Sequence, residues 1–249
     1  MNNQTTWLAA PSDVILPEGE IHVWRADLDQ ESWITSNLEA DLSEDERARA
    51  NKFYFARDRC RFIVARGLLR RTLAAYLGQE PAMLHFCYEL RGKPSLQMSD
   101  TRFPEINFNL AHSNGHAVYA FALRRRLGID LETIRDDFPI IEIAKRFFSA
   151  QEIDQLVELP PDERREAFFL GWTRKEAYVK ARGEGLHIEL GSFGVALAPD
   201  REACFLHGVE VEWHLVSFSS DGSPAALVHD GTRCSVRYFN APFIGAEPE

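Results

Sequence analysis

The sequence predicts an α+β fold in two lobes, because each half of the chain combines helical segments with consecutive strands that suit antiparallel pairing. With 249 residues and 45% hydrophobic content, the chain can bury one sizeable core, or two smaller cores that share an interface. The halves show no sequence repeat, and no low-complexity linker separates them. We place the boundary near the three arginines at 124–126, which gives lobes of residues 14–125 and 126–242.

Two helices are predicted to begin at capping boxes, in which a Ser and a Glu three residues later accept hydrogen bonds from each other's backbone N–H groups. Each half has one such box, Ser43 to Glu46 and Ser149 to Glu152. Longer helices are predicted at 61–77, where apolar residues recur at helical spacing, and at about 162–182. A glycine follows each of these segments, as suits a helix C-terminus.

Strands are predicted mainly where apolar and polar residues alternate between turn residues. The clearest case is 106–110, in which Ile, Phe and Leu alternate with two Asn residues. A turn is predicted at 91–94, before the first of these strands. The predicted strands are 106–110, 116–123, 127–131, 193–198, 210–218, 225–228 and 235–239.

Composition and charge exclude several classes of protein. The formal net charge of −10 argues against a nucleic-acid backbone or an anionic membrane as the main partner. The four cysteines lack zinc-ligand or CxxC spacing, so we expect reduced thiols. We find no signal-peptide pattern at the N-terminus and no segment near the roughly 18 apolar residues of a membrane span, so the cytoplasm is the expected location.

Two carboxylates stand at the end of an apolar strand. Asp130 and Glu132 are two residues apart, so their side chains point to the same side. Carboxylates this close repel each other unless a cation lies between them. Mg²⁺ suits such a site, because it prefers oxygen ligands and usually takes one or two carboxylates plus water and substrate phosphates. The alternative is a strand that runs into an acidic, solvated turn.

A third carboxylate lies on the predicted long helix. Glu176 and Lys180 are four residues apart and share one helix face, which Trp172 also occupies. An exposed ion pair worth about 0.3–0.5 kcal/mol is the simplest explanation of this spacing. The glycine-rich segment that follows the helix favours a nearby ligand instead, since glycine lets the backbone pass close to it. Together with Asp130 and Glu132, Glu176 would then complete a magnesium site, and Lys180 would neutralise a phosphate.

In this order, the segments resemble the 4′-phosphopantetheinyl transferases of the large, surfactin-synthetase-activating type. The resemblance covers roughly residues 43–195 and is specific because six blocks occur in the family's order. These blocks are Phe53–Asp58, Arg91–Pro94, Phe108–Ser113, Gly128–Glu132, Phe147–Ser149 and Trp172–Lys180. The resemblance implies a pseudo-twofold α+β fold with the active site between the lobes, each lobe being a small antiparallel sheet with packed helices.

The resemblance also implies an activity and a set of roles. It implies a monomeric enzyme that uses Mg²⁺ to move the phosphopantetheine arm of coenzyme A onto a serine of an apo acyl or peptidyl carrier protein, releasing adenosine 3′,5′-bisphosphate. By motif position, Asp130, Glu132 and Glu176 are the expected metal ligands. Glu176, or a water that it orients, is the expected base, and Lys180 is expected to stabilise the departing phosphate.

The same comparison assigns the nucleotide end of coenzyme A to the first half of the chain. Arg49, Lys93 and His112 match positions that bind the phosphates of coenzyme A, although each residue alone would more simply be a solvated or hydrogen-bonded side chain. The chain has Ala111 where the family often has Ser, so a hydroxyl contact to coenzyme A is expected to be lost there. We expect the carrier protein to dock on the segment Thr133–Ile140.

Two other functions are compatible with parts of the pattern. One is a module that binds coenzyme A or a carrier protein without catalysis, and the intact set of carboxylates and lysine argues against it. The other is a magnesium-dependent nucleotide hydrolase, which would usually need a phosphate-binding loop such as GxxxxGK[ST], and the chain has none.

Overall fold

The computed structural model describes residues 5–11, 13–88, 94–97, 104–183, 188–210 and 212–241. The first half of the chain contains β1 (Glu20–Asp27), α1 (Ser32–Ala40), α2 (Glu44–Ala50), α3 (Ala56–Leu77), η1 (Pro81–Met83), β2 (Phe86–Tyr88), β3 (Pro94–Leu96), β4 (Ile106–Ser113) and β5 (His116–Leu123). The second half contains β6 (Leu127–Leu131), α4 (Ile140–Phe147), α5 (Ala150–Glu158), α6 (Arg164–Arg182), η3 (Leu190–Ser192), β7 (Gly194–Val195), β8 (Phe205–His207), β9 (His214–Ser220), β10 (Ser223–His229) and β11 (Ser235–Asn240).

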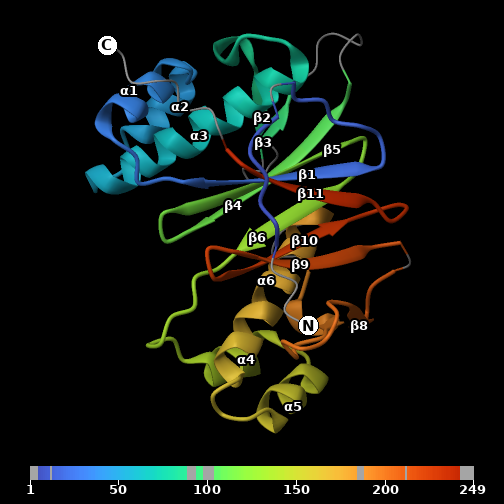
Figure 1. Ribbon diagram of the computed structural model, residues 1–249. Helices are drawn as coiled ribbons and strands as arrows, with labels where there is room; N and C mark the ends of the chain where they lie inside the picture. The colour runs from blue at the N-terminus through green and yellow to red at the C-terminus, as the bar shows by residue number, and fades with distance from the viewer. Residues whose placement is uncertain are drawn as a thin grey trace.

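Two sheets meet in the middle of the molecule, and helices cover their outer faces (Figure 1). One core lies between α1–α3 and the sheet β11-β1-β5-β4, and a second lies between α4–α6 and the sheet β6-β10-β9. A third core joins the inner faces of the two sheets, with Val23 and Val118 on one side and Ile129 and Leu227 on the other. The predicted fold class, α+β in two lobes with small sheets and packed helices, is confirmed.

The sheet of the N-terminal half includes a strand from the end of the chain. β11 pairs in parallel with β1, from Glu20 opposite Ser235 to Arg25 opposite Asn240. This pair departs from the antiparallel pairing that we expect throughout, and it is possible because strands so distant in sequence need no hairpin between them. Residues 235–240 thus lie in the sheet of the first lobe, and the lobe boundaries 14–125 and 126–242 stay a prediction.

Helix α6 lies unusually close to strand β6. A Cβ atom added at Gly128 would collide with backbone atoms of Ala177, Lys180 and Ala181, so only glycine permits this packing. The close approach places the C-terminal turns of α6 over the end of β6. Asp130, two residues after Gly128, therefore points toward the same helix.

The capping boxes and long helices agree with their predictions, since α2 follows Ser43, α5 follows Ser149, and α6 ends before Gly183. Helix α3 begins earlier than predicted, at Ala56, and the elements β1, α1, β2, β3, α4 and β8 were not predicted. The two missed helices lack a capping signal in the sequence, because their N-cap residues are Glu31 and Pro139 rather than Ser, Thr, Asp or Asn. Two predicted strands are shorter than expected: 193–198 forms only β7, which contains a register shift, and 210–218 begins only at β9.

All four cysteines are free, as their spacing predicts. In the part of the chain that the structure describes, every helix is too short or too polar to cross a membrane.

Candidate active site

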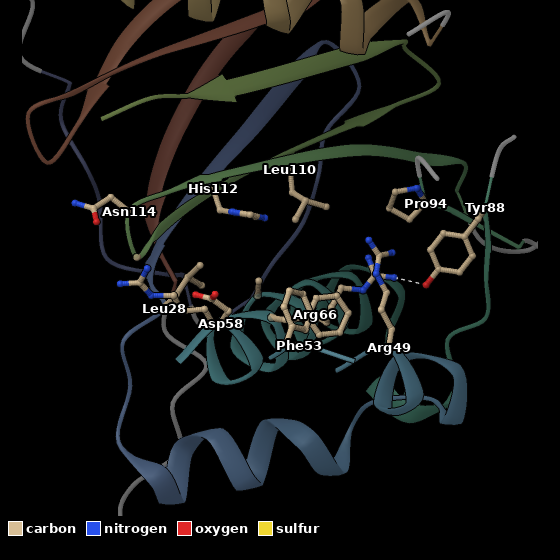
Figure 2. A pocket seen from close by; sticks show the side chains of 14 residues that line it. Leu28, Arg49, Phe53, Asp58, Arg66, Tyr88, Pro94, Leu110, His112 and Asn114 are labelled. Atoms are coloured by element: carbon tan, nitrogen blue, oxygen red, sulfur yellow. Dashed lines mark hydrogen bonds between the residues drawn. The ribbon is translucent and has the colours of Figure 1, made fainter. Parts of the chain in front are cut away.

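A cavity of about 330 Å³ opens in the first lobe between α2, α3 and β4 (Figure 2). Its volume lies within the range of small-molecule sites. The structure brings Arg49 and His112 together on its walls, although they are far apart in sequence. Lys93, the third predicted phosphate ligand, lies outside the described residues. Phe53, Phe62 and Tyr88 add aromatic surface, so the cavity combines cations with rings.

Two arginines of α3 also line the cavity, and the sequence analysis missed them. Arg61 forms a forked pair with Asp29, with Nε and Nη2 at 2.6 and 2.5 Å from the two carboxylate oxygens. Arg66 donates from Nη2 to the Tyr88 hydroxyl at 2.7 Å and from Nε to Glu46 at 3.0 Å. The sequence does hold a signal for them. The α3 residues on the cavity wall stand at 58, 61, 62, 65 and 66, the spacing of one helix face.

The predicted acidic residues gather where β6 meets α6. Asp130 is 5% exposed, and the Lys180 ammonium lies 2.6 Å from its Oδ1 atom. Lys180 also donates to the Ile129 carbonyl at 3.3 Å. Glu132, one position beyond the strand, accepts a hydrogen bond from the Ser113 hydroxyl at 3.3 Å. Lys180, predicted to bind a phosphate, is in this conformation the counter-charge of Asp130.

The electrostatics show that the three carboxylates lie close to one another. Burial raises the pKa of Asp130, against the opposing effect of Lys180. Burial and then the Asp130 charge raise the pKa of Glu132. Burial, followed by the charges of Asp130 and Glu132, raises the pKa of Glu176. Each ionised carboxylate thus disfavours the others, and a cation among them would relieve that repulsion.

The carboxylates fit a hard cation by a second observation. Asp130 Oδ2 is buried, and among the described residues it has no hydrogen-bond partner, which is costly for a carboxylate oxygen. Within the same described ranges, no three His, Cys, Asp or Glu side chains are gathered tightly enough to enclose a metal by themselves. Mg²⁺ does not need such a cage, since it commonly binds one or two carboxylates and completes its shell with water and phosphate oxygens.

His112 connects the cavity with the carboxylates. Its imidazole is open to solvent on the cavity wall, yet partial burial, the Lys180 ammonium and the Arg61 guanidinium lower its pKa. The Arg61 guanidinium belongs to the cavity wall, and the Lys180 ammonium belongs to the group of carboxylates. Neutral imidazole is therefore favoured at the junction, where it can donate one hydrogen bond to an oxygen.

Ala111 does not face the cavity. Side chains of β4 alternate, so that Leu110 and His112 point to the cavity while Ala111 packs in the core between the sheets. A serine at this position would not point at a ligand bound beside His112. The expected loss of a hydroxyl contact to coenzyme A at Ala111 stays a prediction, and the structure shows only that this side chain lies on the face of β4 opposite the cavity.

Two charged residues of the block Trp172–Lys180 have structural partners. Arg174 donates to the Ser217 hydroxyl at 2.8 Å and to the Ala196 carbonyl. Lys175 lies fully buried, 2.8 Å from Glu152, and also donates to two backbone carbonyls. Glu176 differs from both, because it stands on the face of α6 that meets Asp130.

The chain matches known proteins along most of its length. Residues 126–230 match the 4′-phosphopantetheinyl transferase superfamily, and residues 24–123 match the family described as 4′-phosphopantetheinyl transferase, N-terminal. The 4′-phosphopantetheinyl transferase HetI of Nostoc sp. is 45% identical over 90% of this chain and 93% of that protein. The transferase Sfp of Bacillus subtilis is 32% identical over 64% of this chain and 68% of its own, and a transferase of Bacillus pumilus is 34% identical over 67% and 68%.

Proposed function

Because the chain belongs to the 4′-phosphopantetheinyl transferase superfamily and is an enzyme of its two-domain type, we propose the following reaction. The enzyme moves the phosphopantetheine arm of coenzyme A onto a serine hydroxyl of an apo acyl or peptidyl carrier protein. The serine oxygen bonds to the phosphorus that bears the arm, the pyrophosphate bridge breaks, and adenosine 3′,5′-bisphosphate leaves. The reaction depends on Mg²⁺.

One observation supports this proposal above the others. A cavity with several cations and aromatic rings adjoins a cluster of three carboxylates and a lysine, and His112 stands between them. Coenzyme A has a matching shape, since its adenosine and 3′-phosphate lie at one end and its pyrophosphate follows. In the proposal, Arg49, Lys93 and His112 bind phosphates in the first lobe. The pyrophosphate then extends toward Lys180.

Asp130, Glu132 and Glu176 would hold the magnesium ion. A bound Mg²⁺ would neutralise charge on the pyrophosphate and orient it for attack. The buried, unpaired Oδ2 atom of Asp130 supports its role as a ligand. Attack on a pyrophosphate needs alignment and charge neutralisation more than covalent help from the protein, which fits the residue types present.

Glu176 would accept the proton of the incoming serine, directly or through a water molecule. With Mg²⁺ on the neighbouring carboxylates Glu176 would be ionised, as a proton acceptor must be. Lys180 would stabilise the phosphate of the departing nucleotide. It now pairs with Asp130, so a metal on Asp130 would allow the ammonium to turn to the phosphate.

The carrier protein would dock on Thr133–Ile140, directly after the acidic strand end. Arg135 is exposed there and lies 4.5 Å from the Phe138 ring, which itself is only partly buried. A small surface with an apolar component of this kind can bind a partner even though the whole chain is acidic. The exposed Asp136 and Asp137 outnumber Arg135, so the segment itself is net negative and its apolar side chains would make the contact.

A mass-spectrometric assay tests the proposal. The purified protein is incubated with coenzyme A, Mg²⁺ and either a fatty-acid carrier or a peptide-synthetase carrier, both in the apo form. We expect at least one carrier to gain the mass of one phosphopantetheine arm, and a chelator to prevent the gain. If neither carrier gains mass while coenzyme A still binds, the chain is a binding module and the proposed function is wrong.

A further inference from the structure

The two lobes meet at a pair of edge strands that side chains join. β4 ends the sheet β11-β1-β5-β4, and β6 ends the sheet β6-β10-β9 (Figure 1). The Oδ1 atom of Asn109 on β4 accepts a hydrogen bond from the Ile129 N–H on β6 at 2.9 Å. The Ser113 hydroxyl accepts one from the Thr133 N–H at 3.1 Å and donates to Glu132 Oε2 at 3.3 Å.

These contacts replace a backbone ladder. Unpaired N–H groups at a sheet edge are costly when they are buried away from water. Asn109 and Ser113 are four residues apart on one face of β4. Their partners, Ile129 on β6 and Thr133 two positions beyond the end of β6, are also four residues apart. The residue between them on β4, Ala111, is small and 5% exposed, which lets the strands approach.

The contacts bracket the predicted metal ligands. Ile129 precedes Asp130, and Thr133 follows Glu132, so both carboxylates lie between the two fixed points. On its other edge β6 is held by the ladder to β10, in which Asp130 pairs with Ala226. The backbone that carries the two acids is thus held from both sides, and Ser113 also binds one of them directly.

We propose that Asn109 and Ser113 are positioning residues that set Asp130 and Glu132 at a fixed distance from His112. His112 lies between Asn109 and Ser113 in sequence, and its side chain points to the opposite face of β4, into the cavity. The five residues 109–113 of β4 therefore align the proposed phosphate contact of one lobe with the proposed metal ligands of the other. The inference rests on the proposed function, since it takes these acids as the metal ligands.

Ser113→Ala tests the inference with little risk to folding, because the side chain is small and half-buried. Mn²⁺ binding is measured by titration on the full-length protein, apart from the affinity for coenzyme A. We expect the variant to bind Mn²⁺ about tenfold more weakly, as is typical when a partner of a metal ligand is removed. The affinity for coenzyme A should stay within about twofold, because His112 keeps its strand.

Two variants serve as controls. Ser113→Thr keeps the hydroxyl and should restore Mn²⁺ affinity to near the wild-type value. Ser36→Ala, on the exposed side of α1, should change neither affinity. A purely structural serine would lower the melting temperature of Ser113→Ala and leave Mn²⁺ affinity unchanged.

The outcomes separate the two proposals. If the wild type transfers the arm and binds Mn²⁺, but Ser113→Ala binds the metal equally well, the positioning role is wrong and the proposed function stands. Equal weakening of Mn²⁺ and coenzyme A would also contradict a specific positioning role. If the wild type neither binds Mn²⁺ nor transfers the arm, both proposals are wrong.

Discussion

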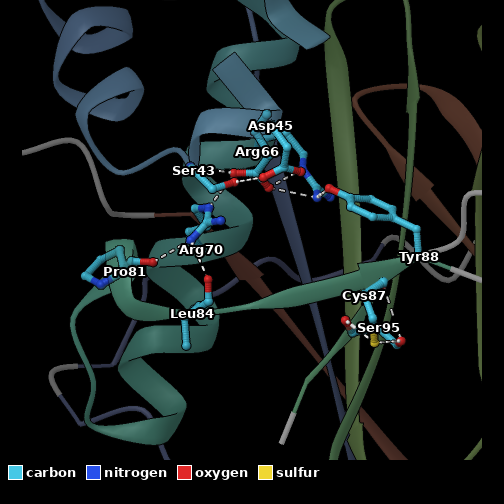
Figure 3. A network of polar contacts seen from close by, with 10 residues as sticks. Ser43, Asp45, Arg66, Arg70, Pro81, Leu84, Cys87, Tyr88 and Ser95 are labelled. Atoms are coloured by element: carbon cyan, nitrogen blue, oxygen red, sulfur yellow. Dashed lines mark hydrogen bonds and ion pairs between the residues drawn. The ribbon is translucent and has the colours of Figure 1, made fainter. Parts of the chain in front are cut away.

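In both lobes the glutamate of a capping box is buried and paired with cations of the long helix. In the first lobe Glu46 is 1% exposed and accepts from Arg66 and Arg70 of α3, the latter at 2.6 Å (Figure 3). In the second lobe Glu152 is 0% exposed and lies 2.8 Å from Lys175 of α6. Each glutamate therefore caps a short helix and fastens it to a long one.

The two anchors differ in what lies beyond them. Lys175 is enclosed by the Leu190 and Phe193 carbonyls, with the Phe193 ring 4.2 Å away, so this anchor is closed to solvent. Arg66 instead reaches the cavity wall and binds the Tyr88 hydroxyl. In the second lobe the anchor Lys175 and the proposed base Glu176 are thus different, neighbouring residues. The first lobe uses the same arginine for stability and for the cavity.

Glu176→Gln gives the largest expected effect. Loss of the base should lower the rate of transfer by about 10²–10⁴-fold, as for a removed general base. The free energy of unfolding should stay the same or rise, since burial and neighbouring acids disfavour the ionised form of Glu176. Single-turnover transfer and urea unfolding measure the two quantities. A near-normal rate would contradict the role of Glu176.

Glu152→Gln is the matched change at the anchor. It leaves the Lys175 ammonium buried without its counter-charge, so the free energy of unfolding should fall by about 3–5 kcal/mol. The fraction of the variant that remains folded should bind coenzyme A with the affinity of the wild type. A loss below about 1 kcal/mol in urea unfolding would mean that the pair does not anchor α5 to α6.

Glu46→Gln should lower both the free energy of unfolding and the affinity for coenzyme A. The expected loss in unfolding free energy is about 3 kcal/mol, at the lower end for a broken buried pair. Arg70 keeps the Pro81 and Leu84 carbonyls as partners, and Arg66 keeps Tyr88. The affinity for coenzyme A should weaken about threefold, because Arg66 is no longer held in one place. Unchanged affinity would show that the first anchor is as separate from the ligand as the second.

The sequence predicted what is encoded locally. Both capping-box helices, the end of α6 and the side on which Asp130 and Glu132 stand follow from spacing alone. The block containing Glu176 was also found, but not the division of labour within it. That Lys175 anchors while Glu176 faces the acids depends on which face of α6 meets β6, and the packing at Gly128 decides that.

Non-local features could not be predicted. The pairing of β11 with β1 joins chain ends more than 200 residues apart, and nothing in either strand specifies the partner. Arg61 and Arg66 join Arg49 at the cavity only after α2 packs on α3. Asn109 reads as the polar side of an alternating strand, whereas in the fold it is buried and binds the edge of another sheet.

A buried histidine in each lobe extends the comparison to pH. His22 and His229 are 2% and 0% exposed, and burial lowers the pKa of both. A lowered pKa in the folded state means that the unfolded chain binds the proton more tightly. Stability from each histidine is therefore complete above the ordinary pKa of about 6.5 and is lost as pH falls below it.

The two histidines should differ in how much stability they lose in acid. Glu20 lies 2.7 Å from His22 Nε2 and favours its proton, whereas His229 Nε2 has no partner among the described residues. His229→Phe, which keeps a ring beside His214, should reduce the loss of unfolding free energy between pH 7 and pH 5 by about 1 kcal/mol. His22→Phe should reduce it less, because the carboxylate of Glu20 already offsets part of the cost of the charge. Urea unfolding at the two pH values measures this difference, and equal effects of the two variants would show that Glu20 does not offset the charge.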